Sequence, residues 1–228
     1  MPDDEPPLPG VAPAAGVNHH VFFAVLADAD AGQKADRLCD EEMALRHLAG
    51  SKVRRERLHV TLVSLGWAAE FPERKALLAR WAAAQVDAPP AFPLRLDRYL
   101  SFQLRNARRP LALCGHGAGV AGFMDLHRSL YRTHDKAYNG GERALCAAPS
   151  VTPHTTLMYS PSVVEEHPVF AMRRISNSGM YSPSVVEEHP VEHVGWTVRE
   201  LQLIYNLRGS PAPYRVLGRW TLQDPRCM

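Results

Sequence analysis

Two short segments that alternate polar and apolar residues constrain the fold most. The first surrounds His59 and Thr61, and the second surrounds His154 and Thr156, 95 residues further along the chain. In a β-strand successive side chains point to opposite faces, so the histidine and threonine of each triplet share one face. Neighbouring apolar residues share the other face, where they can be buried. The pattern predicts two strands, each with an apolar side and a side that carries titratable groups.

The polar faces of these two strands hold two imidazoles, which titrate near neutral pH, and two hydroxyls, which donate hydrogen bonds to oxyanions. This set suits phosphoryl transfer. One neutral histidine takes a proton from an attacking water, and one protonated histidine gives a proton to the leaving oxygen. A single His-x-Thr triplet is common in strands without a catalytic role. Two triplets, each flanked by apolar strand residues, favour a catalytic site.

Several segments of the chain resemble the two-histidine phosphoesterases, and within them the bacterial RNA 2',3'-cyclic phosphodiesterases, which are also called 2'-5' RNA ligases. The resemblance covers nearly the whole chain from residue 19. It rests on an opening strand at residues 20–26 and on two His-x-Thr motifs at residues 58–66 and 153–157. Between the motifs lie a strand at 109–113 and a helix through 126–131, and a closing hairpin follows at 198–204 and 214–220.

The resemblance implies an α+β fold of two lobes related by a pseudo-twofold axis, in which two antiparallel sheets with flanking helices surround a central cleft. It also implies hydrolysis of RNA 2',3'-cyclic phosphate ends to a 2'-phosphate, with 2'-5' RNA ligation as the reverse reaction. His59 would protonate the leaving O3' and His154 would activate water, while Thr61 and Thr156 bind the phosphate. Two nearly equivalent histidines titrate as a coupled pair, so the acid and base roles stay open.

A tandem duplication departs from the family pattern. Residues 158–169 recur without change as residues 180–191, a shift of 22 residues. The first copy continues the second-motif strand, so we expect it to keep the register of that strand, and we expect the surplus to loop out between about residues 160 and 190. Loop closure costs only about 0.6 kcal/mol for each doubling of length. Each copy also carries a capping-box pattern that predicts a helix start, at Ser162 and at Ser184.

Other features of this region leave alternatives open. A duplicated Glu-Glu-His offers carboxylate and imidazole metal ligands, but the duplication already explains its recurrence, so we expect no metal at Glu166, His167, Glu188 and His189. The string Arg173 to Ser176 resembles a basophilic kinase site and is interpreted as an exposed connector. Because the duplication follows the second motif so closely, a module that binds nucleotides or RNA ends with little turnover is the alternative function.

Residues near the motifs supply further candidates. Arginines could contact RNA phosphates, and aromatic side chains could stack on a terminal base. The arginines are Arg54, Arg55, Arg57, Arg105, Arg108 and Arg109, and the aromatic candidates are Phe102 and Tyr159, whereas Phe22 and Phe23 are expected in the core. Thr155 stands where the second motif usually has an aliphatic residue, which weakens the packing face of that strand.

The composition is typical of one enzyme domain over residues 19–228, after a proline-rich tail at 1–18 that we expect to be disordered. Of the 228 residues, 46% are hydrophobic, which is enough to fill a core. No apolar stretch reaches the roughly 18–20 residues of a membrane span, and the acidic start does not resemble a signal peptide. Four cysteines without Cys-x-x-Cys spacing predict free thiols. We therefore expect a cytoplasmic monomer, without a cofactor, that acts on RNA ends or cyclic nucleotides.

Overall fold

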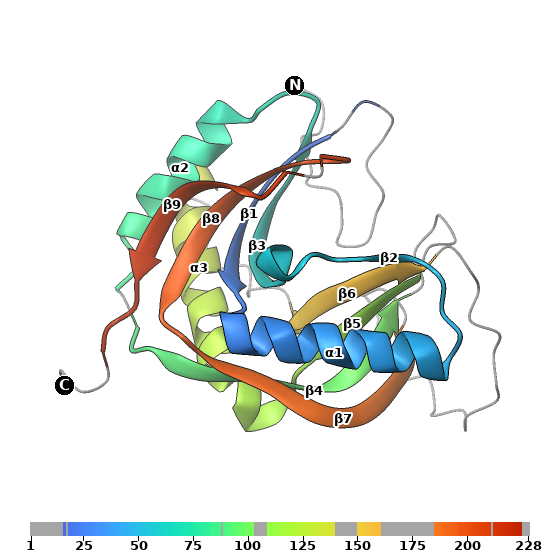
Figure 1. Ribbon diagram of the computed structural model, residues 1–228. Helices are drawn as coiled ribbons and strands as arrows, with labels where there is room; N and C mark the ends of the chain where they lie inside the picture. The colour runs from blue at the N-terminus through green and yellow to red at the C-terminus, as the bar shows by residue number, and fades with distance from the viewer. Residues whose placement is uncertain are drawn as a thin grey trace.

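Strands and helices alternate along the chain in an order that builds two sheets (Figure 1). The computed structural model describes residues 16, 18–87, 89–102, 109–139, 150–160, 185–210 and 212–224. Its elements are β1 His19–Leu26, α1 Ala29–Leu45, β2 Ser51–Lys52, the 3₁₀ turn η1 Arg55–Arg57, β3 His59–Ala68, α2 Glu73–Ala84, β4 Phe92–Phe102, β5 Arg109–Cys114, η2 Gly117–Val120, α3 Ala121–Asn139, β6 His154–Ser160, β7 Val185–Val198, β8 Glu200–Leu207 and β9 Arg215–Thr221.

Both sheets are antiparallel. The first has the strand order β3-β1-β8-β9, and the second has the order β2-β6-β5-β4-β7. The two His-x-Thr strands are therefore in different sheets, β3 in the first and β6 in the second. This arrangement confirms the predicted α+β fold with one motif in each sheet.

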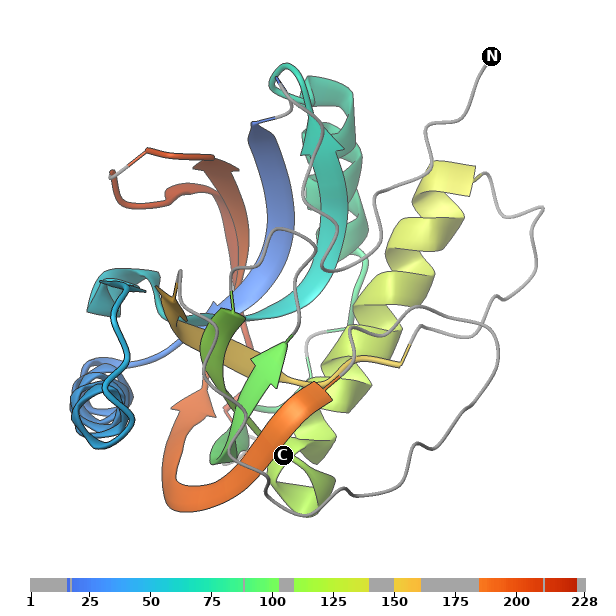
Figure 2. The ribbon, with the colours of Figure 1, turned by 90° about the vertical axis from the view of Figure 1, so that its right-hand side faces the viewer.

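Helices cover the outer faces of the sheets. Helices α2 and α3 lie against the first sheet, and α1 lies against β6 and β7 of the second (Figures 1 and 2). Helix α1 buries Ala31, Ala35, Leu38 and Cys39, which recur at helical spacing on one face. These residues belong to a large core that also includes the apolar sides of β3 and β6.

Two smaller apolar clusters lie on the opposite, inner faces of the sheets. One consists of Phe22, Ala24 and Ile204 in the first sheet, and the other of Leu100, Ala112 and Cys114 in the second. Phe23 is in the main core as expected, but Phe22 points to the other side of β1. The inner face of each sheet is thus apolar beside the polar side chains of its His-x-Thr motif.

The duplicated segment contributes to two different strands. The first copy continues β6 through Ser160, which pairs with β5, as the register argument expected. In the second copy, residues from Val185 onward belong to β7, so the helix predicted to start at Ser184 is wrong. β-Branched Val185 and Val186 favour a strand, and β7 pairs with β4 along its length. The helix predicted at Ser162 and most of the expected surplus loop lie outside the described residues.

Proline is tolerated in β7 because of where it stands. Pro190 lies on the outer edge of the second sheet, opposite Arg98 and beside a register shift at Asp97. Edge strands and bulges are the places where a missing backbone donor costs little. The same shift accompanies the strong bend of β7 in Figure 1.

The chain crosses from the second sheet to the first at Arg199, between β7 and β8. The closing hairpin predicted from residue 198 therefore begins at Glu200 and pairs β8 with β9. Cys39 and Cys114 are buried and form no disulfide. The predicted tail at 1–18 falls almost entirely outside the described residues. Within the described part of the chain, no helix is both long and apolar enough to cross a membrane.

Candidate active site

Both motif histidines are held in the same way. His59 Nδ1 lies 2.8 Å from the carbonyl oxygen of Arg57, and His154 Nδ1 lies 2.8 Å from the carbonyl oxygen of Thr152, in each case two residues back along the chain. A carbonyl oxygen only accepts hydrogen bonds, so Nδ1 carries the proton in each neutral ring. The nitrogen available for base catalysis is then Nε2 in both histidines.

The two histidines come together where the sheets meet. Strand β3 lies against β6 (Figures 1 and 2). Burial, opposed by the hydrogen bond to the Arg57 carbonyl and assisted by the charges of His154 and Arg57, lowers the pKa of His59 from 6.5 to about 4. Burial also lowers the pKa of His154. Both imidazoles are therefore neutral in the free protein at neutral pH, and each is within electrostatic reach of the other.

Each motif threonine lies opposite an alanine on the neighbouring strand. Thr61 lies opposite Ala24 of β1, and Thr156 lies opposite Ala112 of β5. Both alanines are fully buried, whereas both threonines are partly exposed. Residues directly opposite each other in an antiparallel pair share a face. The two hydroxyls therefore project beside a methyl group instead of a bulky side chain.

A β-bulge follows each His-x-Thr triplet. The register shifts between Phe23 and Ala24 on the partner of β3, and between Leu111 and Ala112 on the partner of β6. Strict alternation would place Val63 and Met158 beside the motif histidines and threonines. Instead the extra residue turns both of these into the interior. The residue five positions after each histidine faces out in their place.

Those residues are Ser64 and Tyr159. Both are exposed, and the exposed fraction of Tyr159 is 42%. Tyr159 was one of the expected aromatic candidates, whereas Ser64 was missed because a bulge leaves no mark in an apolar-polar alternation. Burial raises the pKa of Tyr214, the residue before β9, while Arg57 lowers it and Tyr159 adds a smaller increase.

A ring of contacts from the first sheet encloses His59. Its ring packs 5.0 Å from Phe22 and 5.3 Å edge-on from Tyr214, between ring centroids. The Arg57 guanidinium lies 4.4 Å from the centre of the Tyr214 ring, and it donates to Asn206 Oδ1 at 2.8 Å and to the carbonyl oxygen of Ser210 at 3.1 Å. Of the predicted arginines, Arg57 therefore stands at the site.

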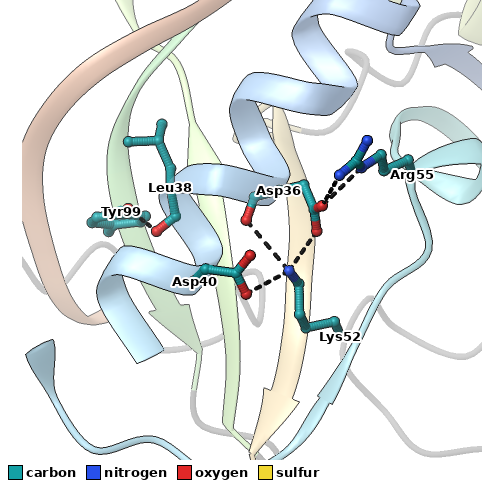
Figure 3. Close-up of polar contacts among 6 residues, drawn as sticks. All are labelled: Asp36, Leu38, Asp40, Lys52, Arg55 and Tyr99. Carbon is teal, nitrogen blue, oxygen red and sulfur yellow. Dashed lines mark hydrogen bonds and ion pairs between the residues drawn. The ribbon is translucent and has the colours of Figure 1, made fainter. Parts of the chain in front are cut away.

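The turn that carries Arg57 is anchored to α1. Lys52 Nζ lies 2.5 Å from Asp36 and 2.6 Å from Asp40, while Arg55 Nη2 lies 2.6 Å from the other oxygen of Asp36 (Figure 3). The hydrogen bond from Lys52 holds the pKa of Asp36 below its ordinary value, and Arg55 acts in the same direction. Arg55 thus has a structural partner, and the network fixes the residues that lead into His59.

The other residues predicted from the sequence are exposed, or their side chains lie outside the described part of the chain. Arg54 is exposed and pairs with Glu56. Arg105, Arg108, Glu166, His167 and residues 173–176 lie outside the described part, as do the side chains of Phe102, Arg109, Glu188 and His189. Among the described residues, no group of three or more His, Cys, Asp or Glu side chains has the arrangement of a metal site.

Comparison with known proteins gives a family and a fold. A family model of the 2'-5' RNA ligase superfamily matches residues 35–210. The structure of E. coli LigT in apo form is 21% identical, with a TM-score of 0.57 over 91% of this chain and 99% of LigT. A structure described as a phosphoesterase gives a TM-score of 0.59 at 21% identity, with the same coverage.

A third structure, TT0787 of Thermus thermophilus, is 19% identical, with a TM-score of 0.55 over 90% of this chain and 99% of that chain. E. coli LigT has also been crystallised in complexes with 3'-AMP and with phosphate. No curated protein matches the chain significantly. At these identities the structural likeness establishes the fold.

Proposed function

Because the chain belongs to the 2'-5' RNA ligase superfamily, we propose that it hydrolyses RNA 2',3'-cyclic phosphate ends to 2'-phosphates, and that it can join RNA ends through the reverse reaction. The observation that carries this proposal is the matched pair of imidazoles. His59 and His154 are each fixed through Nδ1 to a carbonyl two residues back, and they lie within electrostatic reach of each other. Two such groups supply the acid and the base of one displacement.

In the proposed reaction, Thr61 and Thr156 donate hydrogen bonds to the non-bridging phosphate oxygens. Water attacks phosphorus and loses a proton to Nε2 of His154, while the bond from phosphorus to O3' breaks and O3' takes the proton from Nε2 of His59. The 2'-phosphate remains. After the step His154 carries an extra proton and His59 has lost one, and proton exchange with solvent restores the starting state. General acid and general base groups contribute roughly 10²–10⁴-fold each.

His59 must be protonated before it can act as the general acid. Burial holds the pKa of His59 at about 4 in the free protein, so the imidazolium is scarce at neutral pH. An anionic phosphate beside the ring favours the charged form and raises this pKa. Substrate binding would therefore bring a proton to the site, and the division of acid and base follows from which ring the phosphate contacts more closely.

The test is hydrolysis of a short RNA that ends in a 2',3'-cyclic phosphate, measured in the presence of EDTA. We expect conversion to a 2'-phosphate by the unaltered chain, and a loss of at least about 10²-fold for His59→Ala and for His154→Ala. The matched control is His47→Ala, which removes an exposed histidine after α1 and should leave the rate unchanged. Absence of conversion by the unaltered chain, together with retained binding of a 2'-nucleotide, would replace this proposal with the binding module.

A further inference from the structure

A second cluster of polar and aromatic side chains continues the inner face of the first sheet beyond Thr61. His20 Nε2 lies 2.9 Å from Ser64 Oγ, and the backbone N–H of Gly66 donates to the same oxygen at 3.3 Å. The His20 ring stacks on Trp67, with 4.3 Å between centroids and 7° between planes, and on Phe22, with 4.7 Å between centroids. The acid–base chemistry of the two motif histidines uses none of these contacts.

The backbone of β3 is bent on both sides of Ser64 to build this cluster. The bulge after the first motif precedes it, and a second register shift, between His20 and Phe22 on the partner strand, follows it. Gly66 lies at this second shift with φ +84°, a conformation that a side chain makes costly. Bulges that re-aim side chains are common beside active sites. Two of them within one strand leave the Ser64 side chain exposed.

The cluster lies at a distance that suits the rest of a nucleotide. Thr61, Ser64 and Trp67 stand opposite every second residue of β1, namely residues 24, 22 and 20. With a rise of about 3.4 Å per residue, Ser64 and Trp67 are displaced from Thr61 by about 7 Å and about 14 Å along the strand. A group that is attached to a phosphate at Thr61 and extends along β3 in this direction would lie over Ser64 and Trp67.

The chemistry of the cluster favours an uncharged, planar group over a second phosphate. Its side chains are a hydroxyl, an indole and an imidazole, and burial lowers the pKa of that imidazole to about 4, so it is neutral at neutral pH. His20 covers one face of the indole, and Trp67 remains partly exposed. Aromatic side chains stack on any base, and a hydroxyl can donate to or accept from the edge of a base.

We propose that Ser64 and Trp67 form the subsite for the nucleobase attached to the phosphate, with Trp67 stacking on the base, Ser64 hydrogen-bonding to its edge, and His20 as the positioning residue for both. This proposal rests on the proposed function, because it takes the phosphate to lie between the two motifs. His20 acts through its hydrogen bond to Ser64 and its stack on Trp67, and it does not touch the ligand.

The test compares the binding of adenosine 2'-monophosphate with that of inorganic phosphate by isothermal titration calorimetry. We expect Trp67→Ala to weaken nucleotide binding by about 5- to 150-fold, the range for loss of one base stack, and to leave phosphate binding unchanged. Trp67→Phe should retain most of the affinity because it keeps a stacking ring. The matched control is Trp81→Ala, which removes a 57% exposed indole on α2 and should change neither affinity.

Two further variants test the hydrogen bonds that the proposal assigns to Ser64 and His20. Ser64→Ala should weaken nucleotide binding by about 2- to 10-fold, as expected for one neutral hydrogen bond. His20→Phe keeps the stack but loses the bond to Ser64, so it should cause a similar loss, and the double variant should lose little more than either alone. A purely structural effect would weaken phosphate binding equally and would leave the ratio of the two affinities unchanged.

An unchanged ratio in Trp67→Ala, or an equal loss in Trp67→Phe, would overturn the subsite. The binding measurement requires no turnover, so the two proposals fail separately. A changed ratio in a chain that does not hydrolyse cyclic phosphates would retain the base subsite and reject the phosphodiesterase. Hydrolysis of cyclic phosphates together with an unchanged ratio of the two affinities would retain the phosphodiesterase and reject the base subsite.

Discussion

Thr155 carries a buried hydroxyl within the second-motif strand, and replacing it with valine should stabilise the protein. The side chain is 3% exposed, and its Oγ1 has no hydrogen-bond partner among the described residues. The residue stands opposite Leu113 on the core side of β6, between the two motif positions His154 and Thr156. A methyl group in place of the hydroxyl would keep the shape of the side chain and remove the unsatisfied polar atom.

The magnitude follows from the cost of that atom. A buried hydroxyl without a partner costs about 1–3 kcal/mol, and replacing it with an apolar group of similar shape recovers this cost. We therefore expect Thr155→Val to raise the free energy of unfolding by about 1–3 kcal/mol. For a chain of this size, each kcal/mol corresponds to roughly 2–4 °C in Tm. Valine is also a better strand residue, which acts in the same direction.

The assay is urea unfolding followed by circular dichroism, with thermal unfolding as a second measurement. The control is Thr156→Val, one residue further along, where the hydroxyl is partly exposed on the inner face. We expect it to gain little stability and to lose phosphate binding, whereas Thr155→Val should retain phosphate binding. A decrease in the unfolding free energy of Thr155→Val would show that the hydroxyl is hydrogen-bonded, and the account of this strand would then be wrong.

Three further results are expected. The pKa of His59 is lowered from 6.5 to about 4 in the folded protein, so the unfolded chain binds more protons than the folded protein between these pH values. The unfolding free energy should therefore fall as the pH drops from about 6.5 to about 4, by up to about 1.4 kcal/mol per pH unit. Urea titrations of His59→Gln should show a smaller dependence on pH. Ala112→Val fills the space beside the second-motif threonine and should weaken inorganic phosphate binding by at least about ten-fold, or 1.4 kcal/mol, in calorimetry. Lys52→Met removes the cation between Asp36 and Asp40, and chemical denaturation should show a loss of about 1–2 kcal/mol, since hydrogen bonds to charged groups are worth more than neutral ones.

The sequence predicted the elements that carry the motifs because polar and apolar residues alternate around Thr61, and because the second motif repeats that pattern except at Thr155. The helix through Leu126 and Leu130 was likewise predicted, and it is α3, whose core side includes both leucines. The helix expected from Ser184 was wrong because the capping-box pattern is local, whereas the fate of that segment depends on the free edge of β4. Tertiary pairing there outweighs a pattern of four residues.

The residues that the sequence did not reveal share one cause, which is a change of phase within a strand. Alternation assigns Val63 to the face of His59 and Thr61, but one extra residue in β3 turns Val63 into the core and exposes Ser64. The same event in β6 buries Met158 and exposes Tyr159. In both strands the pairing register shifts at the leucine that follows the motif threonine. As a result, the residue five positions after each histidine faces outward in both sheets. The residue type at that position then differs between the lobes, a hydroxyl in one and a phenol in the other. In the proposed site, the equal spacing of the two bulges would place the ligand between Ser64 and Tyr159, and these unequal side chains would give the two halves of a nearly symmetric site different partners for the ligand.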